Sequence, residues 1–118
     1  MKRLIQLVLV FFLLTSLAAC GRRSHELPPL PAGATVLAFG DSLTFGTGAA
    51  PQESYPAVLA SLIGRPVVNA GIPGETTADG LVRFQATLQE HRPALIILCL
   101  GGNDFLQHQG ESETVANL

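Results

Sequence analysis

One stretch of the chain decides the fold: TVLAFGDSL, residues 35–43. Its first five residues, 35–39, are β-branched or apolar, which is typical of a short buried strand. Gly40 and Asp41 favour a turn directly after this strand. The stretch therefore predicts a strand whose carboxyl end is followed at once by Ser42.

A helix and a second strand are expected next. Apolar residues recur at helical spacing between Tyr55 and Ile63, where Ser54 could cap the helix and Gly64 could end it. The β-branched pair that opens residues 67–70 predicts the second strand.

A second helix and a third strand follow the glycine-containing turn at 71–74. Thr76 or Thr77 can cap this helix. Its apolar face is expected to consist of Leu81, Phe84 and Leu88. The continuous apolar run at 94–100 is typical of a strand covered on both faces, and residues 101–104 end it.

The element order is therefore strand, helix, strand, helix, strand, with another helical pattern beginning at 112–118. Units of this kind give an α/β fold with a parallel sheet and right-handed crossovers. Ligands of such sheets bind at the carboxyl ends of the strands.

Residues 1–19 are predicted to form a secretory signal. Lys2 and Arg3 precede an apolar run at 4–14 that only Gln6 interrupts, and small residues follow. A transmembrane anchor is the alternative reading, but a membrane span needs about 20 apolar residues and this run is shorter.

Cys20 is a candidate lipidation site. LAAC at 17–20 resembles the lipobox of bacterial lipoproteins, which implies acyl chains on this cysteine. An ordinary signal that happens to contain a cysteine is the alternative. Residues 20–34 contain three prolines and are expected to tether the domain at 35–118 to the membrane. The expected location is the bacterial cell envelope, at the outer membrane or its periplasmic face.

Composition narrows the possible functions. The chain has 118 residues, which allows one small domain besides the signal. Its hydrophobic content of 47% argues against disorder. A formal net charge of −2 leaves no basic excess for binding nucleic acid.

Three polar, glycine-rich turns follow the three expected strands and carry Ser42, Gly74 and Asn103. Acyl transfer needs a nucleophile and hydrogen-bond donors for the oxyanion. The Ser42 hydroxyl is a candidate nucleophile, and its own N–H is a candidate donor. Gly74 has no side chain, so its N–H can approach a substrate closely. Asn103 offers a side-chain amide.

The same three turns resemble the sequence blocks of the SGNH (GDSL-type) hydrolases. The matching stretches are FGDSL at 39–43, NAGIPGETT at 69–77 and GGND at 101–104. The resemblance is closest to the bacterial arylesterase, lysophospholipase and thioesterase subgroup. It covers the chain from about residue 35 to its last residue.

This resemblance implies a nucleophile at Ser42 and an oxyanion hole formed by the Ser42 N–H, the Gly74 N–H and the Asn103 side chain. It also implies a flavodoxin-like three-layer α/β/α fold, here incomplete, with the first three strands only. The expected activity is hydrolysis of carboxylic esters or thioesters, on a small-molecule or lipid ester, with no cofactor or metal.

The family's Asp-x-x-His block, which supplies the general base, does not occur in the 118 residues. His91 and His108 are expected to be surface residues, because a base must reach Ser42 and be oriented itself. Asp41 and Asp104 are expected to stabilise turns.

This chain is therefore expected to be inactive alone, as a fragment cut off before its catalytic Asp and His. A truncated sheet of this kind would leave a hydrophobic edge at the third strand. The alternative function is a non-catalytic, membrane-tethered binding module. Nucleotide binding is disfavoured, because the loop at 40–48 has neither of the phosphate-binding glycine motifs.

Overall fold

The computed structural model of the chain describes residues 27–118. The predicted signal, the lipidation site at Cys20 and the first part of the tether lie outside the described residues. Within 27–118, no helix combines the length and apolarity that crossing a bilayer requires.

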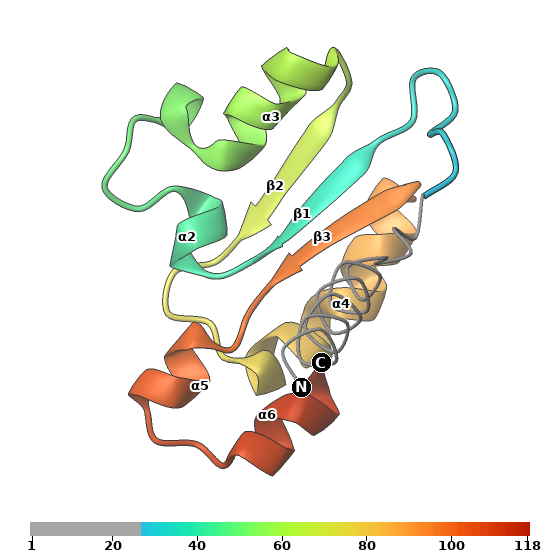
Figure 1. Ribbon diagram of the computed structural model, residues 1–118. Coiled ribbons are helices and arrows are strands. Elements are labelled where there is room, and N and C mark those ends of the chain that lie inside the picture. The colour runs from blue at the N-terminus through green and yellow to red at the C-terminus, as the bar shows by residue number, and fades with distance from the viewer. Residues whose placement is uncertain (1–26) are drawn as a thin grey trace, which may run out of the picture.

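Helices alternate with strands along the described chain, as Figure 1 shows. The elements are β1 (Val36–Gly40), α2 (Ser42–Phe45), the 3₁₀ turn η1 (Pro51–Glu53), α3 (Tyr55–Ile63), β2 (Val67–Gly71), α4 (Thr77–His91), β3 (Leu95–Cys99), α5 (Gly102–Leu106) and α6 (Glu111–Asn117).

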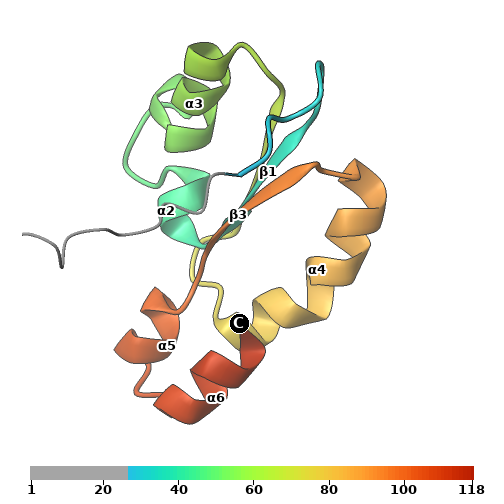
Figure 2. The ribbon, with the colours of Figure 1, turned by 45° about the vertical axis from the view of Figure 1, so that its right-hand side comes forward.

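The three strands form one parallel sheet in the order β2-β1-β3. Helices α2 and α3 lie on one side of the sheet and α4 lies on the other (Figure 2). The predicted α/β fold with a parallel sheet is confirmed. The strand order is the one with which a flavodoxin-like sheet begins.

The core is centred on β1. Its four apolar residues, 36–39, are each at most 1% exposed. The ring of Phe39 meets the ring of Phe84 on α4 edge to face, with 5.1 Å between their centroids. This contact fixes α4 against the middle of the sheet.

The element boundaries differ from the predicted ones in small ways. Each strand matches its predicted position to within one residue at either end. Thr76 is the cap of α4: its hydroxyl accepts from the Asp79 N–H, and the Asp79 carboxylate accepts from the Thr76 N–H. Ser54 precedes α3, but its hydroxyl donates to the Pro51 carbonyl and caps no helix N–H.

Two turns expected as irregular are short helices. Ser42 is the first residue of α2, and Asn103 lies inside α5. Both helices are only about one turn long. Gly46 ends the first in a left-handed conformation, and Gln107 is the C-cap of the second.

The prediction that the third strand is covered on both faces is wrong for the described residues. Ile96 is 37% exposed and Leu98 is 44% exposed. β3 lies at the edge of the sheet, and α4 packs against β1 at Phe39. An apolar run indicates that a strand is suited to burial, but its position in the sheet decides how much of it is covered. The exposed apolar edge expected for β3 is present.

Candidate active site

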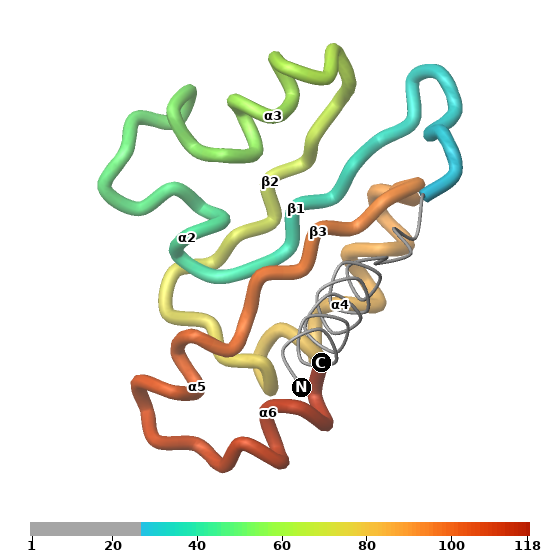
Figure 3. The backbone as a smooth tube through the Cα atoms, in the orientation of Figure 1, coloured from blue at the N-terminus to red at the C-terminus, as the bar shows by residue number. Residues whose placement is uncertain are grey.

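The turns that follow the three strands meet at one end of the sheet (Figure 3). Backbone hydrogen bonds tie them together. The Asp41 N–H donates to the Cys99 carbonyl over 3.3 Å, and the Ile72 N–H donates to the Gly40 carbonyl over 2.9 Å. The turn after the central strand is therefore held between the turns after its two neighbours.

Ser42 is placed by the cap of α2. The Asp41 carboxylate accepts a hydrogen bond of 2.9 Å from the Leu43 N–H, which caps the helix. This confirms the prediction that Asp41 stabilises a turn. Ser42 is half-buried, and no acceptor within 27–118 takes its N–H or binds its hydroxyl. Within the described residues, both groups are thus available to a ligand.

Gly71 lets β2 approach α2 closely. A Cβ atom at this position would clash with the backbone nitrogen of Phe45 and would lie 2.7 Å from the Phe45 Cα. The Asn69 side chain also connects α2 to the end of β2. Its amide donates to the Phe45 carbonyl, and its oxygen accepts from the Gly71 N–H. The helix that begins with Ser42 is therefore held against the end of β2.

Gly74 and Asn103 lie on turns that contact each other. Gly74 has φ +82°, a left-handed conformation that favours glycine, and it is exposed. The Asn103 Nδ2 donates to the carbonyl of Glu75, the next residue, over 2.8 Å. A side-chain amide carries two N–H bonds, so among residues 27–118 the second remains available. No acceptor within 27–118 takes the Gly74 N–H.

Asp104 fixes the turn that carries Asn103. It is 1% exposed, and its carboxylate accepts hydrogen bonds from the N–H and the hydroxyl of Thr77 at the start of α4. Burial acts to raise the pKa of Asp104, but the hydrogen bonds from Thr77 outweigh it, and the pKa is lowered. Asp104 was expected to stabilise its own turn; it instead joins α5 to α4. Sequence alone does not reveal this contact, because 27 residues separate the two partners.

One ion pair near these turns was not predicted from the sequence. Arg83 on α4 pairs with Glu75, and Arg83 also donates to the Ala70 carbonyl over 2.9 Å. Its signal in the sequence was weak, because Arg83 is only a charged residue next to Phe84 in the predicted helix.

Neither histidine of the described chain is joined to Ser42 by a hydrogen bond. His91 lies at the end of α4, 3.8 Å from the Glu90 carboxylate. His108 follows α5 and is exposed. No group of three His, Cys, Asp or Glu residues within 27–118 is placed to hold a metal ion.

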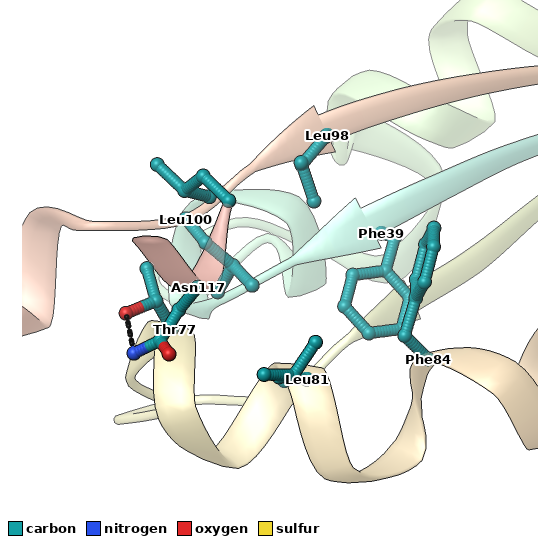
Figure 4. A pocket seen from close by; sticks show the side chains of 9 residues that line it. Phe39, Thr77, Leu81, Phe84, Leu98, Leu100 and Asn117 are labelled. Carbon is teal, nitrogen blue, oxygen red and sulfur yellow. Dashed lines mark hydrogen bonds between the residues drawn. The ribbon is translucent and has the colours of Figure 1, made fainter. Parts of the chain in front are cut away.

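A separate apolar pocket lies between the sheet and helices α4 and α6 (Figure 4). Phe39, Leu98 and Leu100 line it from the strand side, and Leu81 and Phe84 line it from α4. It is not the candidate active site, because neither Ser42, Gly74 nor Asn103 lines it.

The chain is similar to known hydrolases over most of the described residues. The sequence profile of the family described as GDSL-like Lipase/Acylhydrolase matches residues 38–118. Esterase TesA of Pseudomonas aeruginosa is 37% identical over 74% of this chain and 46% of its own length. An uncharacterized lipoprotein of Bacillus subtilis, YqeF, is 31% identical over 82% of this chain and 40% of its own length.

A solved structure shares the same arrangement. The crystal structure of AlinE4, an SGNH-hydrolase family esterase, superposes with a TM-score of 0.69 and 38% identity over 75% of this chain and 51% of that one. The chain thus spans about half the length of these proteins.

Proposed function

The chain belongs to the GDSL-like lipase/acylhydrolase family, and on that premise we propose that the protein hydrolyses carboxylic esters through an acyl-enzyme on Ser42. One observation supports this most: the turns that carry Ser42, Gly74 and Asn103 are joined at one end of the sheet. The relatives named as esterases point to the same chemistry.

In the proposed reaction, the Ser42 hydroxyl attacks the acyl carbonyl of the ester and passes its proton to a general base. The tetrahedral intermediate collapses to an acyl-enzyme, and the alcohol or thiol leaves with a proton. Water then attacks the acyl group and releases the acid, which restores the serine.

The oxyanion of each intermediate would be bound by three donors: the Ser42 N–H, the Gly74 N–H and the second N–H of the Asn103 amide. The absence of intramolecular acceptors for the two backbone groups within 27–118 supports this assignment. Donors that are fixed before the reaction stabilise the transition state without reorganisation. The bond from Asn103 to the Glu75 carbonyl would orient the amide in this way.

A serine needs a base, and no histidine within the described residues is bound to Ser42. The proposal therefore concerns the full-length product of the gene, called the whole-gene protein below. In that protein, the base and its orienting carboxylate would come from an Asp-x-x-His block, which residues 1–118 do not contain.

The decisive experiment is hydrolysis of p-nitrophenyl esters by the whole-gene protein and its Ser42→Ala variant. We expect kcat to fall by at least about 10⁴-fold, because the residual rate would come from binding and the oxyanion hole alone. A fluorophosphonate probe should label the wild type and leave Ser42→Ala unlabelled.

Ser61→Ala is the matched control. Ser61 is an exposed serine on α3, so its loss should leave kcat and labelling unchanged. Unchanged turnover in Ser42→Ala would contradict the proposal.

We also propose that Cys20 carries the lipid anchor and holds the enzyme at the bacterial cell envelope. The lipobox-like LAAC sequence supports this, and the similarity to a lipoprotein of Bacillus subtilis agrees with it. Cys20→Ala should abolish labelling by an alkyne analogue of palmitate and move the protein out of the membrane fraction. Retention of the label in this variant would place the acyl chain elsewhere.

A further inference from the structure

Arg83 makes several hydrogen bonds to the segments that carry the candidate site. Its Nε donates to the Glu75 carboxylate over 2.5 Å, and its Nη2 donates to the other oxygen of the same carboxylate. The same Nη2 donates to the Ala70 carbonyl over 2.9 Å and lies 3.4 Å from the Gly40 carbonyl. The Glu75 side chain is only 4% exposed, so the pair is largely withdrawn from water.

The three partners of Arg83 belong to the segments that carry the proposed machinery. Gly40 ends β1, two residues before Ser42, and Ala70 lies at the end of β2. Glu75 directly follows Gly74. One guanidinium therefore links the strand end of the nucleophile to the turn of the proposed oxyanion donor.

The guanidinium is also held from the side of the core. Its Cζ lies 3.8 Å from the centroid of the Phe39 ring, which Phe84 supports from α4. Gly80, one turn earlier on α4, lies in the same corner: a Cβ there would make ordinary contacts with Phe39 at 3.4 Å and the Glu75 carboxylate at 3.7 Å, but would clash with the Leu100 side chain at 2.5 Å. The guanidinium is thus held by hydrogen bonds at its edge and by the Phe39 ring at its face.

We propose that Arg83 is a positioning residue that holds the Gly74 turn in register with Ser42. This inference rests on the proposed function. Gly74 is exposed, left-handed and without a side chain, so it makes no side-chain packing contact that could fix its N–H. The rigid fork of an arginine can bind a carboxylate and backbone carbonyls at once, which a lysine cannot reproduce.

Another arginine provides the comparison. Arg65 also donates to two backbone carbonyls, those of Leu30 and Pro31, but it does so just before β2 begins, at the opposite end of the sheet. It contacts no part of the proposed machinery. Arg65→Met and Arg83→Met therefore remove the same chemical group from the two ends of the sheet.

The experiment measures kcat and KM for p-nitrophenyl acetate in the whole-gene protein with Arg83→Met, Arg83→Lys or Arg65→Met. We expect Arg83→Met to lower kcat by about 10- to 100-fold, with KM changed less than about threefold, since small misplacements of reacting groups have effects of this size. Arg83→Lys should recover only part of the loss, and Arg65→Met should keep kcat within about twofold.

Amide hydrogen exchange gives a second measurement that needs no turnover. Exchange of residues 72–76 should accelerate in Arg83→Met and stay unchanged in Arg65→Met. If Arg83→Met fails to fold because Glu75 is left buried and unpaired, the double variant Arg83→Met with Glu75→Gln removes that charge and takes its place.

The outcomes separate the two proposals. If Ser42→Ala abolishes turnover while Arg83→Met, or its double variant, keeps full kcat, the positioning role is overturned and the proposed function stands. If Arg83→Lys restores kcat completely, the fork is unnecessary and the role is again overturned. If turnover survives Ser42→Ala, the proposed function fails, and the inference fails with it.

Discussion

β1 and β3 are neighbouring parallel strands of five residues, and they differ sharply in how they are covered. Leu37 on β1 and Ile96 on β3 are partners in the register, yet Leu37 is 0% exposed and Ile96 is 37% exposed. Both strands are strongly apolar in sequence. The difference comes from position: β1 has a strand on each side, whereas β3 has a neighbour on one side only.

At their carboxyl ends, the same two strands are alike. Ser42 follows β1 and Asn103 follows β3, each at the start of a short helix. Hydrogen bonds hold both turns in place, although one strand is fully buried and the other is not. Polar contacts therefore hold the turns at the carboxyl ends of the strands. The packing of neighbouring elements determines how exposed the strands themselves are.

The largest expected effect concerns the buried strand. Leu37→Ala should lower the free energy of unfolding by about 2–5 kcal/mol, because it leaves a cavity in the centre of the core. Urea denaturation measures this loss. The control is Leu62→Ala on α3, where the side chain is 79% exposed and the expected change is within about 0.5 kcal/mol. Equal losses would contradict the central position of β1.

The next effect concerns the end of β3. Asn103→Ala should lower kcat of the whole-gene protein by about 10²–10³-fold, which corresponds to about 2.7–4 kcal/mol of transition-state stabilisation. Gln107→Ala, at an exposed residue four positions later, should leave kcat unchanged. A decrease of less than threefold in Asn103→Ala would remove this side chain from the oxyanion hole.

A smaller effect is expected at Asp104, which holds the same turn. Asp104→Asn should cost about 1–3 kcal/mol at pH 7, because buried donors of Thr77 lose their charged acceptor. The pKa of Asp104 is lowered in the folded state, so the stabilisation is complete above the unfolded pKa of about 3.9 and is lost as the pH falls through the folded pKa.

Urea denaturation between pH 7 and pH 2 measures this dependence. The stability curves of the wild type and of Asp104→Asn should converge below about pH 4. Glu90→Gln removes an exposed carboxylate and should change the stability at pH 7 by less than about 0.5 kcal/mol. A constant difference between the Asp104→Asn and wild-type curves would mean that ionisation of Asp104 does not stabilise the fold.

Local signals in the sequence were sufficient to predict the three strands and the helices α3 and α4, whereas α2 and α5 were expected as irregular turns. The alternation of apolar runs with helical patterns gave all three strands, and Thr76 was one of the two candidates for the cap of α4. The three turns of the candidate site were predicted for the same reason, since the ends of parallel strands meet at one edge.

Contacts between distant segments were not predicted. Arg83 reaches the Gly40 carbonyl across 43 residues of sequence, and Asp104 reaches Thr77 across 27. No local pattern identifies the partner of a buried charge. The covering of β3 on both faces was predicted wrongly, because the apolar run at 94–100 is equally suited to a central strand and to an edge; the exposed edge expected for an incomplete sheet was correct.

The smallest expected effect returns to the register partner of Leu37. Ile96→Ala should lower the free energy of unfolding of this chain by only about 1 kcal/mol, because more than a third of the side chain is already in water. Urea denaturation of Ile96→Ala beside Leu37→Ala gives the difference between the two strands directly. If both substitutions cost the same, the face of β3 that contains Ile96 is covered in solution, and edge position does not explain its exposure. If Ile96→Ala costs little, the position of a strand in the sheet, and not its apolar sequence, determines what its side chains contribute.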